Sequence, residues 1–392
     1  MKLLFTWGVL LACNLVMAQR SDKLHKKAVL VDGHNDVLSA QVLGKQDISK
    51  RLTKGHSDLD RWEEGGVDVQ FFSVFTGPKA RNAEGVFKDA MEQIDSLEQI
   101  VVRNPDRMVL AKNYKDVKQA IKQKKLAALI GVEGGHMIED DMDKLNTLHQ
   151  RGMRYLTLTW NNSTSWATSA MDETQRSDSL THKGLNSFGV QVVKRLNELG
   201  ILVDLSHTGE QTFYDAVAAS SKPVILSHSS VWAICPVFRN VKDEQIKAVA
   251  KNGGVICINF YSGFISKAYD ERLTQLNKIE KPRVQDSLWQ VHKDSALLQQ
   301  AWRIYLRNSI TDVQPTINDL IDHIDYIVKL VGDDYVGIGS DYDGISALPK
   351  GLEDVTTYPK ITAALLEKGY SKKSIRKILG GNVLRVMKAN FK

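Results

Sequence analysis

The sequence has few cysteines, few prolines and only one long apolar run. Its 392 residues include 3 cysteines and 8 prolines. One cysteine falls within the apolar start of the chain, so a disulfide scaffold is excluded and a large hydrophobic core must stabilise the fold. Cys235 and Cys257 either pair with each other or remain buried thiols. No later stretch approaches the 20 apolar residues of a transmembrane helix, which argues against a membrane-spanning protein.

The sequence also lacks a block of charge of one sign. The formal net charge of +6 arises from 52 Lys+Arg and 46 Asp+Glu, which are dispersed along the chain. Because no basic run is interleaved with aromatic residues, we expect no nucleic-acid partner. With 43% hydrophobic and 25% charged residues, the composition is typical of a folded globular protein and not of a disordered one.

The first residues predict an export signal. Lys2 precedes an apolar run over residues 3–12, and Val16-Met17-Ala18 resembles a cleavage site that ends at Ala18. We therefore expect residues 1–18 to be a signal peptide and the mature protein to be periplasmic or extracellular. In a second interpretation, Leu10-Leu11-Ala12-Cys13 is a lipoprotein box, and Cys13 would carry a lipid anchor.

Short apolar runs recur along the mature chain and alternate with stretches of helical character. Most of the runs are continuous, which is typical of buried parallel strands. The eight predicted strands are Ala28–Val31, Val67–Phe75, Leu126–Val132, Tyr155–Thr159, Ile201–Leu205, Pro223–Leu226, Gly254–Phe260 and Tyr335–Ile338. The predicted helices include Glu84–Arg103, Ser187–Leu199 with Ser187 as N-cap, Asp215–Ser220, Asp243–Lys251 and Ile317–Val331.

This alternation predicts an α/β fold of the (β/α)8 TIM-barrel type. Length alone would suggest two or three domains, but barrels of this kind run well past 250 residues as one unit. We expect a single barrel over residues 19–392. Residues 266–315 fit no strand–helix unit, so we expect them to form a helical insertion between strands 7 and 8, over the barrel rim.

Metal-binding residue types follow the first and third predicted strands. Enzymes with this fold carry their chemistry at the carboxyl ends of the strands. His34 and Asp36 are two residues apart in extended chain, so they share a face, and the pair suits zinc. Glu133 follows an apolar run, where a carboxylate is costly to bury unless it is paired or bound to metal. We interpret Glu133 as a bridging ligand between two cations.

Three further strands end in residues of the same kind. The fifth strand ends near His207, the sixth near His228 and the eighth near Asp341, with Asp343 two residues later. Each of these alone could be a hydrogen-bonded core histidine or a turn aspartate. Together, at one end of one barrel, they predict a binuclear metal site.

Six motifs occur in order between Ala28 and Phe391. They are Gly-His-Asn-Asp, Gly-Val-Glu-Gly-Gly-His, Gly-Met-Arg-Tyr-Leu-Thr-Leu-Thr, Asp-Leu-Ser-His, Ser-His-Ser-Ser and Gly-Ser-Asp-Tyr-Asp-Gly. In this order they resemble the renal (membrane) dipeptidase family of zinc metallopeptidases, which have amidohydrolase-like barrels. With the predicted signal peptide, the chain resembles a secreted bacterial member.

The resemblance implies a zinc-dependent dipeptidase with two Zn²⁺ ions per chain. It assigns His34 and Asp36 to one zinc and His207 and His228 to the other, with Glu133 bridging. A hydroxide held between the two ions would attack the peptide carbonyl of a dipeptide.

The resemblance also implies roles for residues that do not bind metal. Arg239 would hold the terminal carboxylate of the substrate, because a guanidinium fork fits a carboxylate. Asp341 would accept the proton of the water, pass it to the leaving amine and contact the ammonium of the substrate. Asp343 is close enough in sequence to be confused with Asp341. Members of the family are often dimers, so a homodimer is expected.

One position departs from the family pattern. The family usually carries a histidine after Thr-Leu-Thr on the fourth strand, where this chain has Trp160. We expect Trp160 to contact the substrate and to donate at most one hydrogen bond, since indole has no titratable proton. Asn161, Asn162 and His136 are candidates to compensate for the missing imidazole.

Three functions fit these residues. The first is a dipeptidase for L-Xaa dipeptides that tolerates D-residues at the C-terminal position. The second is another amide or lactone hydrolase, with a pocket reshaped by Trp160. The third is an inactive, metal-bound binding protein, which the complete set of ligands and Asp341 disfavours.

Overall fold

The computed structural model describes residues 19–392. The predicted signal peptide and the alternative lipid anchor at Cys13 lie outside the described residues. Among the helices that are described, none has both the length and the hydropathy needed to span a bilayer.

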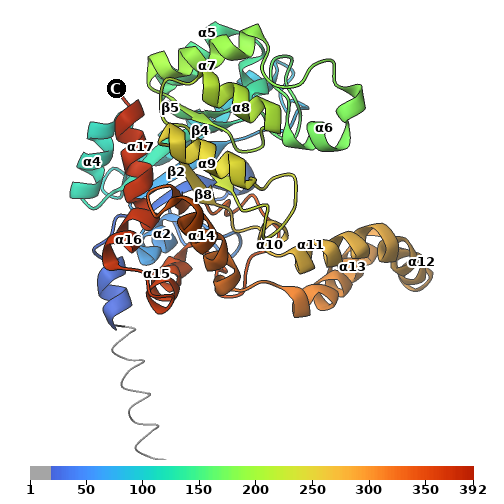
Figure 1. The fold of residues 1–392 in the computed structure, drawn as a ribbon. Coiled ribbons are helices and arrows are strands. Elements are labelled where there is room, and N and C mark those ends of the chain that lie inside the picture. Colours follow the sequence, from blue (N-terminus) through green and yellow to red (C-terminus); the bar gives the residue numbers. More distant parts are fainter. Residues whose placement is uncertain (1–18) are drawn as a thin grey trace, which may run out of the picture.

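A closed barrel of parallel strands forms the centre of the described chain (Figure 1). The strands pair in the order β2-β1-β9-β8-β7-β6-β5-β4, and β4 pairs with β2 to close the ring, while β3 extends the sheet outside it. The bounds are β1 Val31–Asn35, β2 Val69–Val74, β3 Met108–Leu110, β4 Leu126–Glu133, β5 Met153–Thr157, β6 Leu202–Asp204, β7 Ile225–Ser229, β8 Val255–Ile258 and β9 Val336–Ile338.

The predicted TIM-type barrel is thereby confirmed, since each of the eight predicted runs overlaps or adjoins one strand of the ring. The additional strand β3 was not predicted because its three residues are too few to show a pattern. The first and sixth predicted strands end four and three residues before β1 and β7 do, which places His34 and His228 inside these strands instead of after them. The fourth predicted strand is displaced by two residues from β5.

Helices surround the ring of strands (Figure 1). Their bounds are α2 Leu59–Gly65, α3 Val86–Arg103, α4 Tyr114–Lys122, α5 Met142–Arg151, α6 Ala170–Gln175, α7 Ser187–Leu199, α8 Glu210–Ala219, α9 Asp243–Asn252, α10 Ser262–Ile265, α11 Lys267–Gln275, α12 Lys281–His292, α13 Ser295–Ile310, α14 Ile317–Val331, α15 Tyr358–Glu367, α16 Lys372–Arg376 and α17 Asn382–Asn390. Short 3₁₀ or π turns are η1 Leu38–Val42, η2 Gly135–Ile138, η3 Ser177–Ser179, η4 Leu276–Glu280, η5 Thr311–Val313, η6 Val355–Thr357 and η7 Lys377–Gly381.

Three of the predicted helices begin differently from the prediction. Helix α3 begins at Val86, two residues after the predicted start. The N-cap of α7 is Asn186, not Ser187, because the Asn186 side chain accepts the backbone N–H groups of Phe188 and Gly189. Helix α8 begins at Glu210, five residues before the predicted start. The bounds of α14 agree with the prediction at both ends.

The two faces of the barrel sheet pack in different cores. On β4, Ala127 and Leu129 join an inner cluster that includes Tyr155, whereas Ala128 and Ile130 face the outer helices. This alternation continues up the strand, so Gly131 and then Glu133 project into the barrel. The cysteines, whose pairing the sequence left open, are both buried and unpaired in the described chain; Cys257 lies in the inner cluster.

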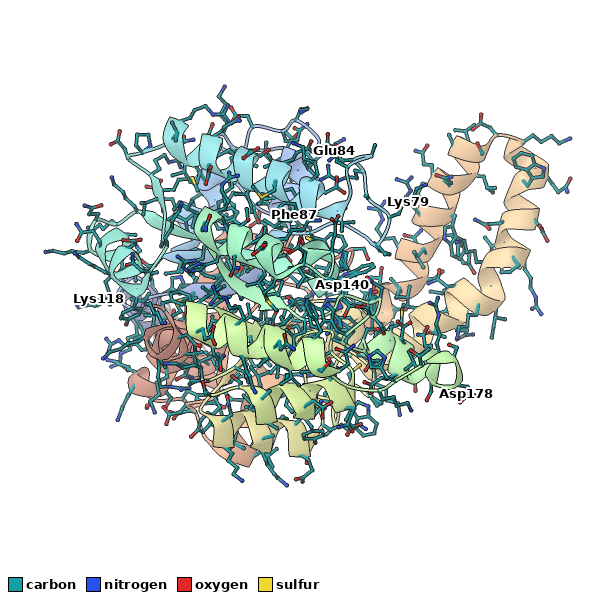
Figure 2. All side chains as sticks on the ribbon, turned by 90° about the horizontal axis from the view of Figure 1, so that it is seen from above. Lys79, Glu84, Phe87, Lys118, Asp140 and Asp178 are labelled. Carbon is teal, nitrogen blue, oxygen red and sulfur yellow. The ribbon has the colours of Figure 1, made fainter. Side chains whose placement is uncertain are left out.

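The predicted insertion is helical and consists of α11, η4, α12, α13 and η5, which together we call the arm. It extends outward from the barrel and does not lie across the rim as predicted (Figures 1 and 2). Tyr269, Leu276, Trp302 and Ile310 form its own small apolar cluster. Loops carrying Lys79, Asp140 and Asp178 lie on the same side of the barrel as the arm, whereas Lys118 of α4 lies on the other side (Figure 2). These loops follow strands, so the carboxyl ends of the strands open toward this side.

We predict that Gly131→Ala lowers the free energy of unfolding by about 1–3 kcal/mol, because overpacking a dense core forces its neighbours to move. A Cβ at Gly131 would lie 1.9 Å from the Tyr155 ring. Gly77→Ala is the matched control, since its Cβ would meet no atom within 4 Å. Chemical denaturation measures both, and equal stability of the two variants would contradict this view of the inner core.

Candidate metal centre and active site

Irregular backbone positions the histidines at the mouth of the barrel. The pairing of β1 with β2 shifts register between Asp32 and Asn35, and that of β7 with β8 shifts between Leu226 and Ser229. Such shifts re-aim side chains that strict alternation would send outward. His34 and His228 lie within these two segments, and their rings approach to a centroid distance of 3.8 Å.

His207 and Asp341 occupy a second kind of irregular backbone. Both have left-handed conformation, with φ of 66° and 62°. Non-glycine residues rarely adopt this region, and where they do, the surrounding structure must hold them there. The two residues follow β6 and β9, at the carboxyl ends of these strands.

The carboxylate of Glu133 lies at the centre of the cluster. Its Oε1 is 2.9 Å from His207 Nε2 and 3.4 Å from His228 Nε2, and its Oε2 is 3.3 Å from His34 Nε2. Asp36 Oδ2 is also 3.3 Å from His34 Nε2. The structure thus brings together all five residues predicted as metal ligands. Each is at least nine-tenths buried.

The donor set fits divalent metal ions. His34 Nε2 and Asp36 Oδ1 are buried and have no hydrogen-bond partner among the described residues. His207 Nε2 and His228 Nε2 lie 3.0 Å apart, both facing Glu133 Oε1. Unpaired buried polar atoms are costly, and imidazole nitrogen with carboxylate oxygen is a donor set that suits zinc.

The other nitrogen of each imidazole is held by an oxygen. His34 Nδ1 is 2.7 Å from Tyr155 Oη, and His228 Nδ1 is 2.8 Å from Ser227 Oγ. His207 Nδ1 is 3.0 Å from Asn161 Oδ1. Because an amide oxygen can only accept, His207 donates from Nδ1 and leaves Nε2 with a free lone pair. Contacts of this kind orient metal-binding histidines.

Asp341 joins the cluster, whereas Asp343 does not. Asp341 Oδ1 lies 3.9 Å from His34 Nε2, and Asn259 donates a 2.8 Å hydrogen bond to Asp341 Oδ2. Asp343 lines the same cavity, but its Oδ1 accepts from Gln41 Nε2 and from the backbone N–H of His56.

Sequence reasoning missed Asn259, Tyr155 and Ser227. The signal for Asn259 was a polar residue inside the apolar run Gly254–Phe260. Tyr155 gave no separate signal because its contact with His34 crosses between strands. Ser227 gave none because a serine beside a histidine is not distinctive in sequence.

Burial and mutual charge shift the protonation equilibria of the cluster. Burial opposes ionisation of Glu133, but the positive charge of His34 beside it holds the pKa of Glu133 well below the usual value. Burial lowers the pKa of His207 to about 3 and that of His228 well below the ordinary value. Burial also raises the pKa of Asp341 well above that of a free carboxyl. His207 and His228 are thus held neutral beside an ionised Glu133, which are the protonation states that metal binding requires of these residues. Burial opposes the charged form of His34, but Tyr155, Glu133 and Asp36 raise the pKa of His34 well above its ordinary value.

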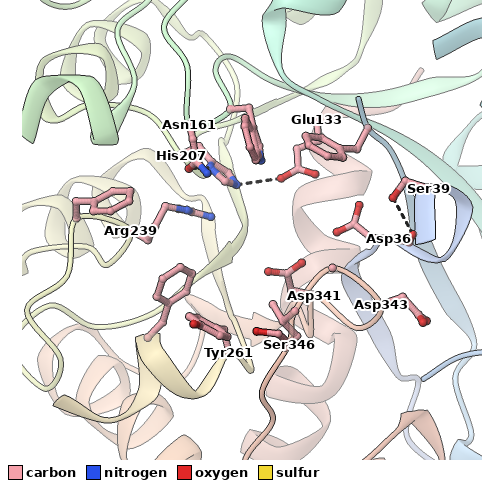
Figure 3. A pocket seen from close by; sticks show the side chains of 16 residues that line it. Asp36, Ser39, Glu133, Asn161, His207, Arg239, Tyr261, Asp341, Asp343 and Ser346 are labelled. Atoms are coloured by element: carbon pink, nitrogen blue, oxygen red, sulfur yellow. Dashed lines mark hydrogen bonds and ion pairs between the residues drawn. The ribbon is translucent and has the colours of Figure 1, made fainter. Parts of the chain in front are cut away.

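A cavity of about 410 Å³ opens over this cluster (Figure 3). Arg239 faces Asp36 and Asp341 across it, and Glu133 and His207 line the wall between (Figure 3). Burial lowers the pKa of Arg239 to about 10, so its guanidinium stays charged near neutral pH.

The predicted substrate residues line this cavity as well. Arg239 donates one hydrogen bond to the His228 carbonyl, and its charged group lies 5.5 Å from the centre of the Phe264 ring. Trp160 packs beside Phe75, with ring centres 5.0 Å apart. Asn161 lines the cavity too, but Asn162 and His136 are not among the residues that line it.

A parallel barrel whose mouth holds buried imidazoles and carboxylates in one open cavity defines a metal-dependent hydrolase. The family model for the membrane dipeptidases, peptidase family M19, matches residues 18–391. The chain therefore belongs to the membrane dipeptidase family and is a metal-dependent dipeptidase.

Solved structures share the fold. The probable dipeptidase PvdM from Pseudomonas aeruginosa is 24% identical with a TM-score of 0.79, and the match covers 95% of this chain and 98% of that one. A metallopeptidase from Rhodobacter sphaeroides, liganded with a phosphinate mimic of the dipeptide L-Ala-D-Ala, is 23% identical with a TM-score of 0.74; this match covers 93% and 99%.

We predict that Glu133→Gln loses at least one equivalent of bound metal relative to the wild type, because the amide keeps the shape but removes the central negative charge. Asp343→Asn is the control, since this carboxylate lies in the same cavity outside the cluster. Metal analysis after gel filtration measures both. Full metal content in Glu133→Gln would contradict a central role for this carboxylate.

Proposed function

We propose that this chain is a zinc dipeptidase with two Zn²⁺ ions per chain. His34 and Asp36 would hold one ion and His207 and His228 the other, with Glu133 bridging. The distances around the two oxygens of Glu133 carry this proposal, because Oε2 faces His34 while Oε1 faces the other two imidazoles. Two such ions supply a water nucleophile near neutral pH and polarise the peptide carbonyl.

The substrate would lie between Arg239 and Asp341. These residues line opposite sides of the cavity, with Glu133 between them (Figure 3). The guanidinium would bind the terminal carboxylate through paired N–H donors, and the carboxylate would contact the free ammonium. Charges fixed at both ends would limit the substrate to two residues, and the scissile bond would lie over the cluster.

Asp341 would move the proton during the reaction. Its Oδ2 is occupied by the Asn259 amide, so Oδ1 is the oxygen that faces the cluster. Burial holds the pKa of Asp341 high, which suits a group that takes a proton from water and gives it to the leaving amine.

Trp160 would form the apolar wall that contacts the substrate. With Phe75 it presents two aromatic rings to the cavity, and its ring centre lies 6.2 Å from that of His207. Its indole N–H supplies one donor and cannot transfer a proton in the reaction. The tolerance of D-residues at the C-terminal position is part of this proposal, in line with the L-Ala-D-Ala mimic bound by the Rhodobacter sphaeroides enzyme.

The setting of the enzyme completes the proposal. Residues 19–392 would act as one catalytic unit after removal of residues 1–18, in the periplasm or outside the cell. A lipid anchor through Cys13 is the alternative to a freely exported protein. The partners would be dipeptides and a second copy of the chain in a homodimer.

Turnover by the purified mature chain with zinc tests this function. We expect hydrolysis of dipeptides with a free amine and a free carboxylate, and none of N-acylated dipeptides. Turnover of N-acylated amides or lactones in preference to dipeptides would instead establish the second candidate, another hydrolase on the same barrel. Bound zinc without turnover of any substrate would indicate a binding protein.

We predict that Arg239→Met raises KM for dipeptides about 10–100-fold, because hydrogen bonds to charged groups contribute about 1.5–3 kcal/mol. Dipeptide amides serve as the control, since they lack the carboxylate, and their kcat/KM should change little. An unchanged KM for free dipeptides would contradict the proposed role of Arg239.

A further inference from the structure

A buried carboxylate lies directly behind the histidine cluster. Asp204, the last residue of β6, is fully buried and accepts four hydrogen bonds. Its Oδ1 accepts the backbone N–H groups of Ser206 (3.1 Å) and Ser227 (2.9 Å). Its Oδ2 accepts the hydroxyls of Thr157 and Ser227, both at 2.6 Å. Nothing in the proposed mechanism uses this residue.

The Ser227 hydroxyl lies between this carboxylate and a proposed metal ligand. Its Oγ is 2.6 Å from Asp204 Oδ2 and 2.8 Å from His228 Nδ1. A hydroxyl has one proton, so it can donate to only one of these two atoms. A carboxylate has no proton to give and is the stronger acceptor, so Ser227 donates to Asp204. Its oxygen then accepts the proton that His228 carries on Nδ1.

We propose that Asp204 acts through Ser227 as a positioning residue that keeps the proton of His228 on Nδ1 and the lone pair of Nε2 directed at the metal. The proposal rests on His228 being a metal ligand. His207 also carries its proton on Nδ1, where Asn161 accepts it. The Nε2 atoms of His207 and His228 are 3.0 Å apart, and both lone pairs face Glu133 Oε1. This arrangement suits a cation between the three atoms. Groups that orient metal-binding histidines contribute about 10–100-fold in metal affinity.

A neighbouring serine provides a matched control. Ser206 is as deeply buried as Ser227, and its Oγ lies 3.3 Å from Ser227 Oγ. However, Ser206 Oγ accepts the backbone N–H of His228 at 3.0 Å and not the imidazole proton. Ser206→Ala therefore removes a buried hydroxyl of the same size without interrupting the path from Asp204 to the ring.

Asp204→Asn tests the proposal most sharply. The amide oxygen of Asn would keep accepting hydrogen bonds from the backbone N–H groups of Ser206 and Ser227. The NH₂ of the amide would then face the hydroxyls of Thr157 and Ser227. Ser227 would then accept from the amide and donate to His228 Nδ1, which moves the ring proton to Nε2. The shape is preserved while the tautomer reverses, as in an Asp-to-Asn change behind a catalytic histidine. Ser227→Ala is the second variant, because it removes the acceptor for the Nδ1 proton.

Zinc affinity, measured at one pH by competition with a chromophoric chelator, is the readout. Asp204→Asn and Ser227→Ala should each weaken binding of one zinc equivalent by about 10–100-fold, and Ser206→Ala by less than about threefold. The absorption spectrum of Co²⁺ in the same site should change in the first two variants only. Melting of the metal-free proteins checks that all three fold.

The outcomes separate this proposal from the proposed function. Wild-type affinity and spectrum in both Asp204→Asn and Ser227→Ala would overturn it, as would an equal loss in Ser206→Ala. If instead His228→Ala binds zinc as the wild type does, the ligand assignment fails and the positioning role fails with it.

Discussion

The structure depends on the burial of one carboxylate, that of Glu133, among three imidazoles. A charge in this position is costly to remove from water, and only close partners offset that cost. Burial opposes the charge of Glu133, but its pKa stays well below the usual value because the positive charge of His34 favours the ionised form. One histidine from the carboxyl end of each of β1, β6 and β7 contacts the carboxylate of Glu133. The barrel mouth is therefore organised around a negative charge that requires cations.

Irregular backbone brings the histidines to Glu133, which regular strands could not do. Alternation along β4, whose pairing with β2 is regular from Ala127 to Val132, delivers Glu133, but His34 and His228 lie at shifts of register, and His207 and Asp341 at positive φ. Hydrogen bonds across the sheet hold these segments, including those of Asp204 to β5 and β7. The rigid sheet below thus maintains strained positions at the rim, as expected of a functional site.

Much of this could be predicted from the sequence, and the remainder follows from interactions that no local pattern contains. Apolar runs predicted the eight barrel strands, and the polar residues after them predicted the cluster of histidines and carboxylates at the barrel mouth. Metal-binding residue types carry that signal themselves. The direction of the arm depends on packing. The N-cap at Asn186 and strand β3 involve too few residues to give a pattern in the sequence. Asn259 contacts Asp341 from a neighbouring strand, and Ser227 contacts His228 within an irregular part of β7. Both contacts depend on the register of the strands, which a local sequence pattern does not contain.

The most direct test of the central role of Glu133 is anomalous scattering at the zinc edge from crystals of the mature protein. The proposed ligand assignment predicts two peaks, one at zinc–ligand distance, about 2.0–2.2 Å, from His34 and Asp36, the other at that distance from His207 and His228, with Glu133 in contact with both. A single peak, or peaks not in contact with Glu133, would contradict a metal centre built on this carboxylate.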